Sequence, residues 1–223
     1  MDLASYIDHT LLKPDSTAQQ IDVLCAEARQ YQFASVCILP WHVARATAIL
    51  AGSDVLICTV IGFPLGATTT QAKISETLDA ISRGASEIDM VASLTALKSG
   101  MHGDVLEDIR AVTVAAHDHG AIVKVIIETC LLNDAEKKQM CAIVTQAGSD
   151  FIKTSTGFST GGATIEDVRL LREHVGAKVF VKASGGIRDR VSALAMIEAG
   201  AARLGTSSGV VILGSHERNN EIE

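Results

Sequence analysis

Short apolar runs alternate along the chain with longer segments in which apolar residues recur every three or four positions. Each short run has the length and the β-branched content of a strand, and each longer segment has the periodicity of an amphipathic helix. The runs follow one another at an average spacing of about 28 residues, the length of one βα unit. Eight such runs cover residues 5–10, 35–40, 55–63, 87–92, 122–129, 151–156, 178–184 and 202–207.

Eight βα units account for the whole chain of 223 residues, because eight units of about 28 residues need about 224. Several runs are apolar on both faces, as strands are when helices cover one side and a barrel interior fills the other. The pattern predicts an α/β protein with one domain, a (β/α)8 or TIM barrel over residues 1–214. An open doubly wound sheet is the alternative. Residues 215–223 are polar, and we expect a flexible C-terminal tail there.

Capping residues support the predicted helices. Thr17 with Gln20, and Thr164 with Asp167, have the spacing of a reciprocal N-cap, and Asn133 precedes another helical segment. Four helical segments end on a glycine, which can adopt the left-handed conformation that turns the chain back into a strand. These glycines are Gly84, Gly120, Gly148 and Gly200.

Composition narrows the choice of partners and compartment. The chain has 19 basic and 26 acidic residues, a net charge of −7 and no basic cluster, so we expect no nucleic-acid binding. Its mean hydropathy is +0.28, yet no apolar run approaches the roughly 18 residues that span a bilayer. The N-terminus lacks the apolar segment of a signal peptide. We therefore expect a cytoplasmic protein without membrane contact, whose five widely spaced cysteines are reduced thiols.

Catalytic groups of a parallel barrel lie at the carboxyl ends of its strands, and two lysines stand out there. Lys153 and Lys182 lie in consecutive apolar runs. One lysine alone would be weak evidence, because its head could pair with Glu128 or an aspartate. Two ammonium groups side by side in a water-poor interior favour a lowered pKa on one of them, which makes that lysine a nucleophile able to form a Schiff base. Asp89 either pairs with a lysine or completes a proton-transfer site.

Two turns indicate the ligand. SGGIR follows the seventh run and GTSSG follows the eighth, the places where barrels most often bind phosphate on backbone N–H groups. We therefore expect a phosphorylated small molecule. The sequence contains no nucleotide-binding or metal-binding motif in the required context, so we expect no cofactor and no metal. Cys37 is either a packed thiol or a residue that lines the pocket.

These motifs carry a resemblance to a known family. YIDHTLLKPD, VIGFPLG, EIDMV, KVIIET, FIKTSTGF, VKASGGIR and GTSSG together extend over nearly the whole chain. With them the sequence resembles the class I deoxyribose-phosphate aldolases. The resemblance implies a TIM barrel that reversibly cleaves 2-deoxy-D-ribose 5-phosphate to acetaldehyde and D-glyceraldehyde 3-phosphate without a metal, in the catabolism of deoxyribonucleotides.

The resemblance also implies a role for each matching residue. Lys153 corresponds to the Schiff-base lysine, and Lys182 to a second lysine that lowers the pKa of the first and takes part in proton transfer. Asp89 corresponds to the proton donor and acceptor, and Asp8 to a further acid in that relay. The expected substrate and phosphate contacts are Thr154, Gly157, Gly185, Gly186, Ser207 and Ser208.

The chain departs from some members of the family. Phe158 stands where some relatives have a lysine, and the chain ends in Glu223 where some relatives end in a tyrosine, so we expect slower turnover unless another group assists. Two alternatives stay open at this point: another Schiff-base barrel, such as a transaldolase-like enzyme, and a non-catalytic barrel that binds phosphosugars. If the chain associates, the expected assembly is a homodimer.

Overall fold

Eight parallel strands close into a barrel in the computed structural model, which describes residues 2–214. Each strand pairs with the next one in the sequence, and β8 pairs with β1 to close the ring. The predicted barrel and its eight predicted strands are confirmed, whereas the predicted flexible tail lies outside the described residues. The strands are β1 (Ile7–Leu11), β2 (Ser35–Ile38), β3 (Leu56–Ile61), β4 (Glu87–Val91), β5 (Ile122–Ile126), β6 (Phe151–Lys153), β7 (Phe180–Ser184) and β8 (Arg203–Thr206).

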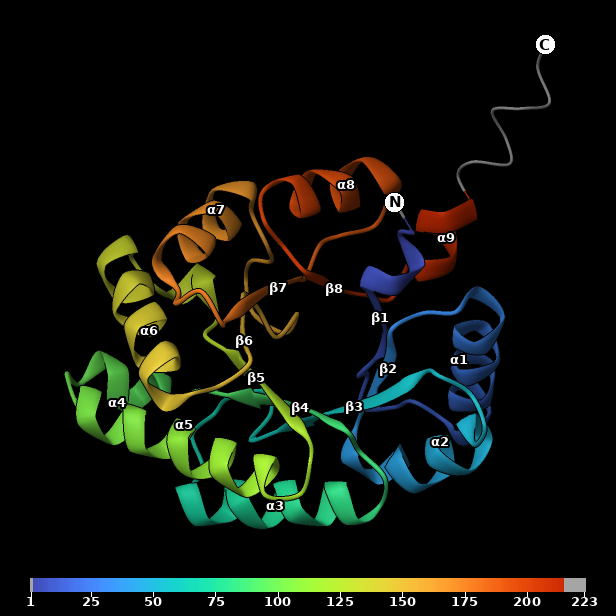
Figure 1. The fold of residues 1–223 in the computed structure, drawn as a ribbon, viewed down its shortest axis with the longest axis horizontal. Helices are drawn as coiled ribbons and strands as arrows, with labels where there is room; N and C mark the ends of the chain where they lie inside the picture. The colour runs from blue at the N-terminus through green and yellow to red at the C-terminus, as the bar shows by residue number, and fades with distance from the viewer. Residues whose placement is uncertain (1, 215–223) are drawn as a thin grey trace.

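Helices surround the barrel as an outer ring, and β1 lies beside β8 at the point of closure (Figure 1). The α-helices are α1 (Ala18–Tyr31), α2 (Val43–Leu50), α3 (Thr70–Ser82), α4 (Leu94–Lys98), α5 (His102–His117), α6 (Asp134–Ala147), α7 (Ile165–His174), α8 (Arg190–Glu198) and α9 (Gly209–Gly214). Short 3-10 helices are η1 (Ala4–Tyr6), η2 (Pro40–His42) and η3 (Thr129–Leu131). No helix within residues 2–214 has the length and hydropathy of a membrane span.

The helix boundaries follow the predicted caps, with one exception. Thr17 and Asn133 each form a reciprocal capping box, the first with Gln20. Thr164 accepts a hydrogen bond from the N–H of Asp167, but the expected reciprocal bond is wrong because the Asp167 carboxylate lies 2.7 Å from Lys137 Nζ instead. All four predicted C-terminal glycines have a positive φ, between 76° and 113°.

Side chains alternate along each strand between two faces, one toward the surrounding helices and one toward the interior of the barrel. Ile88 and Met90 flank Asp89 on β4 and are fully buried in the apolar layer between strands and helices. Asp89 points the opposite way, into the barrel, because successive side chains of a strand alternate between faces. The register then sets which residues meet at one level: Asp89 pairs with Lys124, and Lys153 pairs with Lys182.

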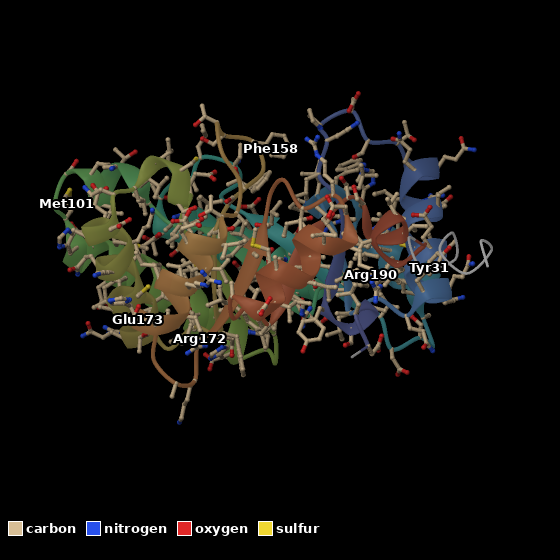
Figure 2. All side chains as sticks on the ribbon, turned by 90° about the horizontal axis from the view of Figure 1, so that it is seen from above. Tyr31, Met101, Phe158, Arg172, Glu173 and Arg190 are labelled. Carbon is tan, nitrogen blue, oxygen red and sulfur yellow. The ribbon has the colours of Figure 1, made fainter. Side chains whose placement is uncertain are left out.

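The loops at the carboxyl ends of the strands form one face of the molecule. Phe158, in the loop after β6, lies on the opposite edge from Arg172 and Glu173 near the end of α7 (Figure 2). A cavity lined by residues of these loops reaches Lys153 at the end of β6.

Candidate active site

A layer of charged side chains crosses the inside of the barrel. It contains four basic and three acidic residues from six of the eight strands. All are buried except Arg203, whose side chain is 14% exposed. The layer consists of Asp8 on β1, Glu87 and Asp89 on β4, Lys124 on β5, Lys153 on β6, Lys182 on β7 and Arg203 on β8.

Asp89 is the centre of this layer. Its Oδ2 accepts hydrogen bonds from Nζ of Lys153 and Nζ of Lys182, each at 2.7 Å, and its Oδ1 accepts one from Lys124 at 2.9 Å. Burial by itself would raise the pKa of Asp89, but the three neighbouring ammonium groups hold it well below its usual value. Asp89 is therefore ionised at neutral pH. The structure thus brings Lys153, Lys182 and Asp89 together, as the sequence predicted.

Lys182 is held as a cation. It donates to Asp8 as well as to Asp89. Burial opposes its charge, yet these two carboxylates raise the pKa of Lys182 above its usual value. Asp8 in turn accepts from Ser35 at 2.7 Å and from Arg203 at 2.6 Å. Burial would raise the pKa of Asp8, but Lys182, Lys124 and Arg203 lower it. Asp8 thus lies beside the predicted relay and anchors Lys182.

Three charged members of the layer were not identified from the sequence. Lys124 donates to Glu87 at 2.6 Å, and Arg203 contacts both oxygens of Glu87 at 3.2 Å. Catalytic groups are expected at the carboxyl ends of strands, but Lys124 is the third residue of the apolar run 122–129 and Arg203 the second of the run 202–207, so both lie near the opposite end of the strand expected from the sequence. The sequence did contain a signal for Glu87. It is two positions from Asp89 on one strand, so the two carboxylates share a face.

A cavity of about 380 Å³ leads from the mouth of the barrel to Lys153. Lys124 and Lys182 do not line it, so Lys153 is the lysine of this layer that a ligand in the cavity meets. Gly157, Gly185, Gly186 and Ser207, four of the six predicted substrate contacts, lie on the wall. Further lining residues are Thr10, Leu11, Leu12, Lys13, Thr156, Phe158, Ser184, Ile187, Arg188, Gly205 and Thr206.

The other two predicted contacts have structural partners. Thr154 is fully buried, and its hydroxyl exchanges hydrogen bonds with the backbone of Ser184 at 3.1 Å. The N–H of Ser208 donates to Thr206 Oγ1 at 2.9 Å. Neither residue lines the cavity. In contrast, Gly186 and Ser207 form no hydrogen bond with any residue of the described part of the chain, so their N–H groups are available to a ligand.

Two cations at the cavity were missed by the sequence analysis. Lys13 and Arg188 line it and are exposed. Arg188 ends the SGGIR motif, and Lys13 belongs to the first motif, so both were visible as residues but not as phosphate partners. Phe158, which replaces the lysine of some relatives, also lines the cavity and packs edge-on against Phe63 at a ring distance of 5.2 Å.

Glu128 holds the loop that carries Gly157. Its backbone is left-handed, with φ of 51°, and its carboxylate accepts hydrogen bonds from the hydroxyl of Thr156 and from the N–H of Thr156, the latter at 3.2 and 3.3 Å. The idea that Glu128 pairs with one of the lysines is therefore wrong, and Asp89 takes that place.

Two groups of buried side chains have the composition of metal ligands, namely Cys37, Cys58 and Asp89, and Asp8, Cys58 and Glu87. Cys58 Sγ and Asp89 Oδ1 already accept hydrogen bonds from Lys124, at 3.2 and 2.9 Å. A divalent cation here would have to compete with ammonium groups for the same atoms.

The family model for the DeoC/LacD family of aldolases matches residues 3–214. The chain belongs to this aldolase family. The resemblance derived from the sequence motifs is confirmed, and the match extends over every strand and helix of the barrel.

Relatives from this aldolase family match the chain over nearly its full length. The deoxyribose-phosphate aldolase of Brevibacillus brevis is 59% identical over 96% of both chains, and that of Alkaliphilus oremlandii is 54% identical over 98% of both. The solved structure of the tetrameric deoxyribose phosphate aldolase from Aeropyrum pernix is 35% identical, with a TM-score of 0.90 over 96% of this chain and 91% of that one.

Proposed function

We propose that this chain is a class I aldolase that reversibly cleaves 2-deoxy-D-ribose 5-phosphate to acetaldehyde and D-glyceraldehyde 3-phosphate. The observation that carries the proposal is the shared oxygen of Asp89, which is hydrogen-bonded to both Lys153 and Lys182 while Lys153 alone of the two lines the cavity. This arrangement places an accessible amine and a fixed cation within hydrogen-bond distance of the same carboxylate. The names of the relatives support the same substrate.

The carboxylates of the layer are shared unequally among its lysines. If every group of the layer were ionised, its four basic and three acidic residues would leave one positive charge in excess in a buried site. Lys182 and Lys124 are each bound to at least two carboxylates, whereas within residues 2–214 Asp89 is the one carboxylate that forms an ion pair with Lys153. Lys153 is therefore the lysine of the layer with the fewest carboxylate partners and the one that borders the cavity, so it is the nucleophile in this proposal.

The reaction begins when Lys153 Nζ attacks C1 of the open-chain aldehyde and water leaves, which gives a protonated imine. A base removes the proton of the C3 hydroxyl, and the C2–C3 bond breaks. Its electron pair moves into the imine to form an enamine, and D-glyceraldehyde 3-phosphate leaves as the free aldehyde. Protonation of the enamine at C2 and addition of water then release acetaldehyde and restore the amine.

Asp89 carries out the proton transfers in this proposal, and Lys182 supports it. Asp89 is ionised, so it can accept the hydroxyl proton through a water molecule and later return a proton to C2. Lys182 is protonated and bonded to the same carboxylate oxygen, so it compensates the charge of Asp89 at each stage and can exchange a proton with it. Asp8 and Arg203 keep Lys182 in place.

The phosphate occupies the far wall of the cavity in this proposal. The free N–H groups of Gly186 and Ser207 indicate a binding site for an anion, because backbone donors are well suited to phosphate oxygens. Arg188 and Lys13 supply the positive charge that is absent at Phe158. We further propose a cytoplasmic location, which suits free thiols. The homodimer stays a prediction.

Borohydride trapping tests the proposed function. Incubation with acetaldehyde and borohydride should leave a reduced two-carbon adduct on Lys153, found by peptide mass spectrometry. An adduct on Lys182 without one on Lys153 would contradict the assignment. Binding of the sugar phosphate with no adduct on any lysine would favour a non-catalytic phosphosugar-binding barrel.

A further inference from the structure

Two cysteines lie side by side inside the barrel, next to Asp89. Cys37 on β2 and Cys58 on β3 are register partners, and both are fully buried. Register partners on adjacent parallel strands project to the same face of the sheet. The two Sγ atoms lie within 4.8 Å of each other and of an Asp89 oxygen. The proposed mechanism uses neither thiol.

The backbone at this pair suits a disulfide. Neighbouring strands are about 4.8 Å apart, which falls inside the range of about 4.4–6.8 Å over which Cα atoms are bridged by a disulfide. We propose that Cys37 and Cys58 are a redox-sensitive pair: a hydroperoxide oxidises them to a disulfide that suppresses proton transfer at Asp89, and a thiol reductant reverses it. Both cysteines are free in the structure.

The oxidation balances in two steps. The thiolate of Cys37 attacks a peroxide oxygen, the O–O bond breaks, and Cys37 becomes a sulfenic acid as hydroxide leaves. Cys58 then attacks that sulfur, the S–O bond breaks, and water leaves as the disulfide forms. The single S–H of Cys58 can be directed to Asp89 or to Cys37. When it is directed to Cys37, this hydrogen bond lowers the pKa of Cys37, ahead of the opposing effect of burial, whereas burial raises the pKa of Cys58. The first thiolate is therefore that of Cys37.

One side chain connects this pair of cysteines with the cavity. Cys37 and Cys58 belong to a cluster with Leu12 and Val60, and Leu12 also lines the cavity that ends at Lys153. Leu12 therefore belongs both to the cluster that holds the two thiols and to the wall of the cavity that a peroxide molecule can enter.

The disulfide would change the surroundings of Asp89. Cys58 Sγ donates its proton to Asp89 Oδ1 at 3.1 Å and accepts from Lys124 at 3.2 Å. Cys37 Sγ also donates to Asp89, at 3.9 Å. A disulfide has no S–H, so Asp89 loses both thiol donors and the contact between Lys124 and Cys58 is weakened. We expect kcat to fall about tenfold, because a hydrogen bond to a buried charge is lost.

The test uses a Cys130→Ser background, since Cys130 is the exposed cysteine and would form intermolecular disulfides. Folded protein is treated with hydrogen peroxide, alkylated and digested with trypsin. The expected products are a loss of two hydrogens in the intact mass, a disulfide between peptides 30–45 and 46–73, and a fall in kcat that dithiothreitol restores. Cys25 and Cys141 serve as internal controls, because burial raises their pKa to about 11 and about 12; they should remain reduced.

Single variants complete the design. Cys37→Ala and Cys58→Ala should each abolish the linked peptides and the part of the activity loss that dithiothreitol restores, and circular dichroism checks that both remain folded. The proposal is overturned if Cys37 and Cys58 stay free while the buried controls oxidise, or if the linked peptides form and kcat is unchanged. Trapping of the two-carbon adduct on Lys153 in the reduced protein tests the proposed function separately from either outcome.

Discussion

Replacement of Asp89 by asparagine removes the one group that all three lysines of the layer share. The asparagine keeps the shape of the side chain but has no charge, so Lys124, Lys153 and Lys182 lose their common counter-ion. The excess positive charge of the layer rises from one to two when all remaining groups are ionised. We expect both stability and catalysis to fall, for different reasons.

The expected losses of stability and turnover can be estimated from these contacts. Removal of one partner from a buried ion pair costs about 3–5 kcal/mol. For a domain of this size about 1 kcal/mol corresponds to roughly 2–4 °C in Tm, so Tm should fall by about 6–20 °C. Loss of a positioned general base lowers turnover by about 10²–10⁴-fold. The stability loss is below the typical total of about 5–15 kcal/mol, so the variant should be folded at 25 °C.

Asp108→Asn is a matched control. Asp108 on α5 is also buried and accepts hydrogen bonds from the fully buried Lys73 at 2.5 Å and from Thr70 at 2.8 Å. It lies in the helical layer, away from the cavity. Its substitution should lower Tm in a similar way and leave kcat unchanged, which separates damage to the fold from damage to the chemistry.

The decisive assay follows the exchange of the acetaldehyde methyl protons with deuterated water by NMR. This exchange isolates formation and protonation of the enamine from cleavage of the sugar. Asp89→Asn should lose exchange in proportion to its loss of cleavage. Undiminished exchange would assign the proton transfer to another group, and an equal loss in Asp108→Asn would show that the effect is structural.

Three further predictions use the same site. Lys182→Leu should lower trapping of acetaldehyde at pH 7 because the layer no longer has an excess cation, whereas Lys182→Arg should spare trapping better than turnover; equal trapping in all three proteins would defeat the electrostatic explanation. Ser207→Asp should lower kcat/KM for the phosphorylated sugar more than a hundredfold, since a carboxylate about 5 Å from the phosphate repels it by about 3 kcal/mol at an effective dielectric constant of 20; deoxyribose without phosphate should escape this loss. Finally, Asp8 and Asp89 have lowered pKa values when folded, so their contribution to stability is full above about pH 5 and is lost as the pH falls below about 4; thermal unfolding should show a steeper acid loss for the wild type than for Asp89→Asn.

The fold was predictable because its signal repeats. Eight apolar runs at regular spacing specify eight βα units, and caps such as Thr17 and Asn133 mark helix starts through local contacts that sequence spacing determines. The pair of Lys153 and Lys182 was predictable for a similar reason, since lysine is costly in an apolar strand and two of them on consecutive strands need an explanation.

The remaining site residues depend on register and loop geometry, which spacing does not encode. Lys124 meets Asp89 because β4 and β5 pair in one register, and a shift of one residue would turn Lys124 out of the barrel. Ser207 and Ser208 are adjacent and chemically identical, yet the first lines the cavity and the second is bonded to Thr206. Only the path of the chain after β8 distinguishes them.

Four buried lysines of this chain show that burial by itself does not make a lysine reactive. Lys73 has one carboxylate partner and faces the helical layer, where it links α3 to α5. Lys124 and Lys182 have at least two carboxylates each, which stabilise their charge. Lys153 shares its single carboxylate with two other cations and borders the cavity. The reactive lysine is therefore the one for which the local anions are too few, and the neighbouring cations are as much a part of its activation as the carboxylate that it contacts.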